Sequence, residues 1–410
     1  MRLLHTSDWH LGRSFHGASL LDEQAEALDR IVELAVDNAV DLVVIAGDLY
    51  DRAIPPAEAV QLFTATLARL RRADIAVVAI AGNHDSHVRV SVYDPLLSAL
   101  GVTIRGDVGR LQEPVLVQPK DGGRVVAVYP LPYLEPSLHG PLLQPLRQEQ
   151  LEWQAEAEPG AEGGAEAVAG GRISHESITR LALEVIRRDL ATRAGSRSVL
   201  VAHAFVAGGQ SSDSERELSV GQVDRVRVEA FAGFDYVALG HLHGSQQLDG
   251  PRLAYSGTPL PYSFSEERQR KSVRLVELAA DGTPSVELLP LGVGRPLQTL
   301  EGTLEALCRD PAYDGARQAR VRAILTDETL PLQAMARLRE RFPHAVELRH
   351  QPPEVQRSSA SQRSQTIRQA RSPLELATSF FVDQQGRDAT PGEEALLREA
   401  LEQARRTEER

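Results

Sequence analysis

The stretch DLVVIAGDLYD, which runs from Asp41 to Asp51, joins an unbroken apolar run to a glycine and to carboxylate side chains. A run that is apolar without alternation predicts a β-strand covered on both faces, as the strands of parallel sheets are. Gly47, directly after the run, allows the sharp turn that brings Asp48 to the carboxyl end of the strand. Ligands of open α/β sheets bind at that edge. The stretch therefore predicts an α/β fold whose strand ends carry the functional groups.

The same order, an apolar run followed by polar residues, recurs outward from this stretch. Such runs occur at Leu3–Thr6, Ile75–Ala81, Ser198–Ala202 and Tyr236–Leu239. Further apolar runs lie at Val125–Tyr129, Leu253–Tyr255, Val273–Leu278 and Val286–Leu291. Helical periodicity predicts helices near Leu20–Val36, Pro56–Arg71 and Ser91–Leu100. Strands that alternate with helices and then follow one another predict layered β-sheets flanked by helices.

Polar residues with metal-binding side chains follow five of the predicted strands, and none of them is a cysteine. They are Asp8, His10, Asp48, Asn83, His203, His241 and His243. A mixed set of nitrogen and oxygen donors suits Mn, Fe or Zn better than Ca or Mg. The set is too large for one tetrahedral site but suits two ions about 3.5–4 Å apart that share a carboxylate. A single buried histidine is more often a core residue than a ligand, and His203, alone after its strand, is the weakest member.

The spacing and order of these residues resemble those of the calcineurin-like metallophosphoesterases. The shared motifs are D-x-H at Asp8–His10, G-D-x-x-D at Gly47–Asp51, GNHD at Gly82–Asp85, a lone His203 and GHLH at Gly240–His243. The resemblance implies a sandwich of two mixed β-sheets flanked by helices. It also implies two divalent ions that stabilise the attacking and leaving oxygens of a phosphoryl displacement.

Each residue of the set takes a role from this resemblance. One ion is implied to be held by Asp8, His10 and His243, and the other by Asn83, His203 and His241, with Asp48 as the bridge. His84 is implied to contact the substrate phosphate, either stabilising the transition state or protonating the leaving oxygen. An imidazole suits that role because it exchanges protons near neutral pH. Asp85 is expected to orient His84, as carboxylates beside functional histidines do.

Finer motifs resemble one branch of that family, the SbcD nuclease subunits of bacterial SbcCD complexes. They are DWHLGR from Asp8, GDLYDR from Gly47, Ser214–Arg216, and YSGTP from Tyr255 with Ser265–Glu266. The resemblance implies a Mn²⁺-dependent DNA nuclease, a 3′→5′ exonuclease on double strands and an endonuclease at hairpins or single strands. Its implied role is DNA end processing, recombination and repair. The coiled-coil ATPase SbcC is the implied partner, and a homodimer within a heterotetramer is the implied assembly.

Changes in composition divide the chain into four parts. We expect a nuclease domain over residues 1–291, a small α/β capping domain over 292–350, a linker over 351–372 and a helical hairpin over 373–410. The Ala/Glu/Gly-rich insert 155–171 is expected to be a disordered loop. In the hairpin, Thr390 and Glu393 predict a capping box, and an apolar stripe follows at Leu396, Leu397, Ala400 and Leu401. We expect the stripe to bind SbcC, or alternatively to cover the capping domain.

The formal net charge of −12 argues against nucleic-acid binding by bulk attraction, which depends on basic side chains. Contact with DNA is therefore expected to be local, or supplied by bound ions and a partner. Cys308 is the single cysteine, so a disulfide within the chain is excluded and a cytoplasmic setting is expected. Apolar runs stay short of the roughly 18 residues of a membrane span. The sequence lacks a GxxxxGK[ST] phosphate loop, so ATP chemistry is assigned to the partner.

Two other functions fit parts of the same pattern. A phosphatase can share both the fold and the metal ligands, since a fold does not decide its substrate. A non-catalytic scaffold for SbcC is expected to have lost metal ligands, whereas every position of the set holds a metal-binding residue type. The helices near 56–71 and 91–100 serve either as dimer contacts or as core elements.

Overall fold

The computed structural model describes residues 1–143, 174–193, 195–215, 225–352 and 389–408, with the isolated positions 374, 377, 378 and 381. The predicted insert at 155–171 and residues 353–372 of the predicted linker lie outside the described residues. The chain divides into two compact units. Unit 1 comprises Met1–Thr299 with Gln318–Val321, and unit 2 comprises Leu300–Arg317 with Arg322–Arg410.

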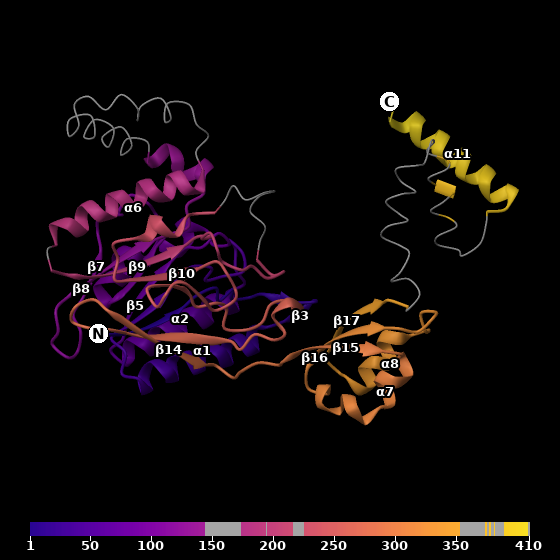
Figure 1. The fold of residues 1–410 in the computed structure, drawn as a ribbon, viewed down its shortest axis with the longest axis horizontal. Coiled ribbons are helices and arrows are strands. Elements are labelled where there is room, and N and C mark those ends of the chain that lie inside the picture. The colour runs from indigo at the N-terminus through magenta and orange to yellow at the C-terminus, as the bar shows by residue number, and fades with distance from the viewer. Residues whose placement is uncertain are drawn as a thin grey trace. The chain divides into compact units, whose positions relative to one another are not determined.

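Unit 1 is built around two six-stranded mixed sheets (Figure 1). The first has the order β14 (Pro284–Pro290), β13 (Ser272–Leu278), β1 (Arg2–Thr6), β4 (Leu42–Ile45), β5 (Ala76–Ile80) and β6 (Val102–Arg105). The second has the order β11 (Gln246–Asp249), β12 (Leu253–Tyr255), β10 (Tyr236–Gly240), β9 (Arg197–His203), β8 (Val126–Leu131) and β7 (Val115–Val117). The predicted pair of mixed sheets is confirmed.

Aliphatic side chains from both sheets fill the space between them. Leu3, Val44 and Val78 come from the first sheet, and Val128 and Val199 come from the second. In the first sheet, four adjacent strands run parallel to one another: β1, β4, β5 and β6. In the second sheet, the four adjacent parallel strands are β8, β9, β10 and β12. Because parallel strands end at the same edge of a sheet, the polar loops after β1, β4 and β5 lie together, as do those after β9 and β10.

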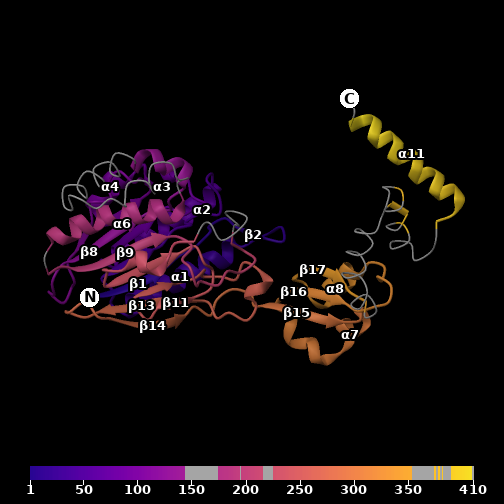
Figure 2. The ribbon, with the colours of Figure 1, turned by 45° about the horizontal axis from the view of Figure 1, so that its top comes forward.

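Helices cover the outer faces of both sheets. Helices α1 (Leu21–Asp37) and α2 (Ala57–Arg72) pack on the first sheet. Helix α6 (His175–Thr192) packs on the second sheet, and Figure 2 shows it running over β8 and β9. The layers of unit 1 are therefore helix, sheet, sheet and helix. Its short elements are β2 (Ser14–Phe15), β3 (Ala18–Ser19) and the 3-10 turns η3 (Val228–Phe231) and η4 (Phe264–Glu266).

The prediction of one helix over Ser91–Leu100 is wrong, because the structure divides this stretch. Helix α3 (His87–Ser91) ends before α4 (Asp94–Leu97), and a 3-10 turn, η1 (Ser98–Leu100), follows. Pro95 donates no backbone hydrogen bond, and inside a helix its ring clashes with the carbonyl four residues earlier. The proline is tolerated where it stands, in the first turn of α4.

A third sheet has three strands in the order β15 (Leu297–Gly302), β16 (Arg320–Leu325) and β17 (Ala345–His350). The first residues of β15 and β16 are counted with unit 1, and the rest of both strands with unit 2. Helix α7 (Leu304–Arg309), the turn η5 (Pro311–Ala316) and helix α8 (Ala334–Arg341) belong to unit 2. Unit 2 therefore has the small α/β character that the sequence predicts.

The last described helix, α11 (Pro391–Glu408), begins with the predicted capping box. The N–H of Thr390 donates to Oε2 of Glu393 at 2.8 Å, and the N–H of Glu393 donates to Oγ1 of Thr390 at 3.4 Å. Most of the first predicted hairpin helix lies outside the described residues. Within the part of the chain that the structure describes, no helix is long and apolar enough to cross a bilayer.

Candidate metal centre

Five strands of unit 1 deliver the seven predicted ligands from their carboxyl ends. Strand β1 leads to Asp8 and His10, β4 to Asp48, β5 to Asn83, β9 to His203, and β10 to His241 and His243. Six of these side chains are buried, and Asn83 is half-buried. The structure thus brings together residues that lie more than 200 positions apart in the sequence.

Asp8, His10 and His243 form one group of donors. Their ligand atoms lie within 4.8 Å of one another, and Nε2 of His10 lies 3.2 Å from Nε2 of His243. The carboxylate of Asp8 is held by the backbone N–H of His241, which donates to Oδ1 at 3.0 Å. Two lone pairs that face each other at this distance repel unless a proton or a cation lies between them. The group therefore suits a shared cation.

Asn83, His203 and His241 form a second group. Oδ1 of Asn83 lies 2.8 Å from Nε2 of His203 and 3.2 Å from Nδ1 of His241. Asp48 reaches both groups, because its Oδ2 lies 3.5 Å from Nε2 of His10 and 3.6 Å from Nε2 of His203. One carboxylate oxygen thus occupies the position that a bridging ligand requires.

The backbone at this edge is strained. The φ angles of Asp8, His10, Asp48 and His241 are 52°, 45°, 48° and 109°, in the left-handed region that L-residues rarely adopt. Such conformations cost of order 1–3 kcal/mol each and persist where the surrounding structure imposes them. These four are half of the eight non-glycine residues with positive φ in the described chain. The strain is therefore concentrated at the predicted ligands.

Burial shifts the ionisation of the donors in opposite directions. It raises the pKa of the Asp8 carboxyl well above its ordinary range, and the charge of Asp48 raises it further. Burial also raises the pKa of Asp48 to about 6 and lowers the pKa of His203 to about 3. The pKa values of His10 and His243 fall well below the ordinary value for the same reason.

The donor set fits two divalent ions. Imidazoles that burial keeps neutral and carboxylates whose anions burial destabilises are what such ions bind, since metal ligands must be deprotonated. Nδ1 of His10 and Nδ2 of Asn83 are also buried and, among the described residues, have no hydrogen-bond partner. Unpaired buried polar atoms are rare in folded proteins and call for a functional explanation. Nitrogen and oxygen donors without thiolate suit the Mn, Fe or Zn class.

The surroundings of His84 differ from the expectation that Asp85 orients its ring. Nδ1 of His84 lies 2.9 Å from the backbone carbonyl oxygen of Asp51, and the N–H of His84 donates to Oδ1 of Asp48 at 2.9 Å. The Asp85 carboxylate instead accepts backbone N–H bonds of 2.9 to 3.0 Å from Gly82, Leu49 and Tyr50. Asp85 therefore ties the loop after β4 to the loop after β5, and the backbone of Asp51 orients the ring.

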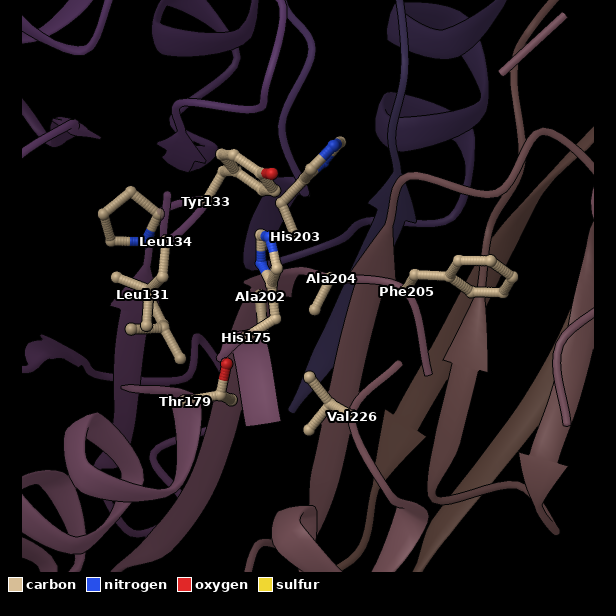
Figure 3. A pocket seen from close by; sticks show the side chains of 11 residues that line it. Leu131, Tyr133, Leu134, His175, Thr179, Ala202, His203, Ala204, Phe205 and Val226 are labelled. Carbon is tan, nitrogen blue, oxygen red and sulfur yellow. The ribbon is translucent and has the colours of Figure 1, made fainter. Parts of the chain in front are cut away.

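A small pocket lies beside His203 (Figure 3). It is lined by Leu131, Pro132, Tyr133, Leu134, His175, Thr179, Ala202, Ala204, Phe205 and Val226. This largely apolar lining explains why burial dominates the pKa of His203. Nδ1 of His203 lies 2.9 Å from the carbonyl oxygen of Ala46. Because a carbonyl only accepts, Nδ1 carries the proton and Nε2 offers its lone pair toward Asp48 and Asn83.

Several residues around the site have no role in the sequence analysis. Gln24, buried on α1, donates from Nε2 to the carbonyl oxygen of His10 at 2.8 Å and accepts from the N–H of Gly12 at 3.0 Å. Its place in an amphipathic helix carries no signal of this contact. Ser214 and Glu266 lie in segments that resemble SbcD subunits, which is the only signal the sequence gives for them.

Comparison with known proteins agrees with this geometry. The family model for calcineurin-like phosphoesterases matches residues 1–245, and a model described as the type 5 capsule protein repressor C-terminal domain, SbcD_C, matches residues 293–385. The SbcD subunit of the SbcCD nuclease of Bacillus subtilis (strain 168) is 35% identical over 301 residues, which cover 72% of this chain and 71% of the relative.

Two solved structures are similar at lower identity. The protein TT1561 of Thermus thermophilus has a TM-score of 0.39 at 13% identity, covering 71% of this chain and 98% of that one. A dimetal phosphatase from Danio rerio has a TM-score of 0.36 at 14% identity, covering 71% and 96%. The family models and the Bacillus relative carry the assignment, because these TM-scores are low. The chain belongs to the calcineurin-like phosphoesterases and, within them, to the SbcD family of nuclease subunits.

Proposed function

We propose that this chain cuts DNA with a two-metal phosphodiesterase site, as a 3′→5′ exonuclease on double strands and an endonuclease at hairpins or single strands. The observation that carries the proposal is the place of Asp48, whose Oδ2 lies within 3.6 Å of ring nitrogens from both donor groups. A shared carboxylate holds two ions about 3.5–4 Å apart in enzymes of phosphoryl transfer. The nuclease name of the Bacillus relative supports a nucleic acid as the substrate.

Two Mn²⁺ ions are the proposed cofactors. One is assigned to Asp8, His10 and His243, the other to Asn83, His203 and His241, and Asp48 is assigned to both. When bound, two such ions stabilise the attacking and leaving oxygens of an in-line displacement at phosphorus. The protein holds their ligands at the carboxyl ends of strands from both sheets, with six of the seven buried from solvent, so that little reorganisation accompanies the reaction.

His84 is the proposed proton donor to the leaving oxygen. Its ring is half-buried and lies edge-on to the ring of His10, with 4.7 Å between centroids, so it borders one donor group. Nδ1 faces the carbonyl oxygen of Asp51, which only accepts, so this nitrogen keeps its proton. Nε2 is then the atom that gains and loses a proton. Asp85 is the proposed support of this arrangement, because it fixes the two loops that flank His84.

A homodimer is the proposed assembly. The segment from α3 to η1 exposes Val88, Val92, Tyr93, Leu96 and Leu100, each by more than half of its surface. Exposed apolar side chains gathered in one segment are a feature of interaction surfaces in soluble proteins. A second copy of the chain is the proposed occupant, as the resemblance to SbcD subunits implies.

The coiled-coil ATPase SbcC is the proposed partner of α11. Leu396, in the predicted apolar stripe, is 67% exposed in the described structure. An amphipathic helix with its apolar side uncovered docks on grooves or on other helices. A chain that works with SbcC on chromosomal DNA ends is placed in the cytoplasm, at the nucleoid.

Substrate class is tested by offering the purified chain several phosphates in Mn²⁺. We expect digestion of end-labelled duplex and hairpin DNA and of bis(p-nitrophenyl) phosphate, with little hydrolysis of the monoester p-nitrophenyl phosphate. Hydrolysis of the monoester without digestion of DNA would make the chain a phosphatase. Absence of all cutting, even with SbcC and ATP, would make it a scaffold.

A further inference from the structure

His243 has four polar atoms, and all of them except the ring nitrogen Nε2 are hydrogen-bonded to residues that the proposed reaction does not use. Its N–H donates to Oε1 of Glu215 at 2.8 Å. Its carbonyl oxygen accepts from the N–H of Thr258 at 3.1 Å and from Nζ of Lys271 at 2.9 Å. Its ring Nδ1 is hydrogen-bonded to Oγ of Ser214. The remaining atom, Nε2, faces the donor group of the metal centre.

A chain of hydrogen bonds continues from Ser214 to a buried ion pair. Oγ of Ser214 donates to Oε1 of Glu266, and Nζ of Lys271 donates to Oε2 of the same carboxylate. Glu266 is 1% exposed. The other donors of Lys271 go to the carbonyl oxygen of His243 and to Oε1 of Gln269, the latter at 2.8 Å. Lys271 is one of only two lysines among 45 basic side chains, and its compact ammonium matches three acceptors in a way that a planar guanidinium does not.

The chemistry of these groups decides which atom donates and which accepts in each of these hydrogen bonds. An ionised carboxylate only accepts hydrogen bonds, so the hydroxyl of Ser214 gives its one proton to Glu266. Oγ of Ser214 then accepts from His243, which places the ring proton on Nδ1 and leaves the lone pair on Nε2. Lys271 supplies the opposite charge that a buried carboxylate requires.

We infer that Ser214 and Glu266 are positioning residues for one metal ion, because they fix the tautomer and the orientation in which His243 offers Nε2 to it. The inference rests on the proposed two-metal site. Metal-binding histidines that donate their second ring nitrogen to a hydrogen-bonded acceptor are more basic and better oriented ligands.

The hydrogen-bonded series Ser214, Glu266 and Lys271, called the relay from here on, reaches the first donor group through His243. His203, in the second group, obtains the same tautomer from the backbone carbonyl oxygen of Ala46. That acceptor belongs to the loop after β4 and does not depend on any side chain of the relay. Loss of Ser214 or Glu266 should therefore weaken the ion assigned to Asp8, His10 and His243 and spare the other ion.

Calorimetric titration of Mn²⁺ into the metal-free full-length chain tests this asymmetry. In Ser214→Ala, which leaves the pair of Glu266 and Lys271 intact, we expect one of two binding events to weaken by about 10–100-fold. The other event should keep its wild-type affinity. Ser214→Thr keeps the hydroxyl and should restore both events. Glu266→Gln should reproduce the selective loss.

The matched control is Glu277→Gln. In the wild type, the carboxylate of Glu277 on β13 is 60% exposed and pairs with Arg2, away from the relay. It should bind both ions as wild type does. Unchanged affinities in Ser214→Ala, or equal weakening of both events, would overturn the inference, even if the variant melts at a lower temperature. A wild-type chain that binds fewer than two ions would instead overturn the proposed two-metal site, so the two failures are distinguishable.

Discussion

Asp48 contacts both donor groups and His84 from a strained backbone position. Its Oδ2 faces both donor groups, its Oδ1 accepts the N–H of His84, and its backbone has a φ of 48°. Aspartate tolerates the left-handed region better than most residues, because its short side chain can bond locally. Asp48 therefore couples the strained turn after β4 to the residue proposed to protonate the leaving group.

The buried carboxylates predict how the stability of the metal-free chain depends on pH. Folding raises the pKa of Asp85 to about 7 and that of Asp8 well above its ordinary range, because both are buried. This contribution is complete at low pH and is lost as pH rises through the folded pKa. Histidines with lowered pKa act in the opposite sense only below about pH 6.5, where unfolded imidazoles take up protons. The unfolding midpoint should therefore fall as pH rises from about 6.5 through about 7, the folded pKa of Asp85.

Scanning calorimetry in EDTA and in MnCl₂ checks this dependence. In saturating Mn²⁺ the fall should become smaller, because the ions bind the deprotonated form of the ligand Asp8 and their binding strengthens as pH rises. A midpoint that stays constant or rises with pH in EDTA would show that the carboxylates are already compensated by other charges.

The strands were predictable because they are buried on both faces. The runs that predict β1, β4, β5, β9 and β10 are apolar except at His5, Thr6 and Ser198, and the polar residues after them mark the sheet edge. Edge strands such as β7 and β11 are short and partly exposed, so they lack this signal. Helix α6 follows the low-complexity insert and was missed, although Ser174 and Ser177 form a capping box at its start.

The site was predictable as a set of residues but not as a geometry. Sequence order places the candidate ligands after strands, and the family motifs assign their roles. The sequence does not show that Asp85 bonds to the backbone of Leu49 and Tyr50, nor that Ser214 bonds to His243. These contacts join loops that are distant in the chain, and local pattern carries no information about them.

The close approach of β10 to β4 predicts the cost of a methyl group at Gly240. A Cβ atom there would lie 1.7 Å from the carbonyl oxygen of Ala46, the acceptor that holds His203. Gly240→Ala should destabilise the chain by about 1–3 kcal/mol, as overpacking does. Urea unfolding measures the loss, with Gly315→Ala, where a Cβ meets open space, as control. Equal stabilities of the two variants would contradict the close packing of the strand ends.

At the scale of the molecule, the metal-binding donor groups and the helix proposed to contact SbcC lie in different units of the chain. The donor groups lie within unit 1, whereas α11 belongs to unit 2. The acidic balance of the whole chain leaves DNA affinity to local contacts, to the bound ions and to partners. Activity on DNA should therefore depend on assembly more than activity on a small diester does.

The exposed apolar segment from α3 to η1 predicts a dimer that one charge disrupts. Leu96 is 71% exposed, so Leu96→Glu should leave the fold intact and convert a dimer to a monomer. Size-exclusion chromatography with light scattering measures the mass. Leu332→Glu, at a leucine that is 89% exposed in unit 2, is the control and should remain dimeric. A dimeric Leu96→Glu variant would place the interface elsewhere.

The most direct test of the two-metal account is the rate of duplex DNA digestion as a function of Mn²⁺ concentration, for wild type, His84→Gln and Asp48→Asn. His84→Gln should lower the plateau rate by about 10²–10⁴-fold at an unchanged half-saturating Mn²⁺ concentration, since it removes a proton donor but no metal ligand. Asp48→Asn should shift half-saturation to much higher Mn²⁺, because both donor groups lose their shared carboxylate. A wild-type plateau in His84→Gln, or unchanged half-saturation in Asp48→Asn, would contradict the account.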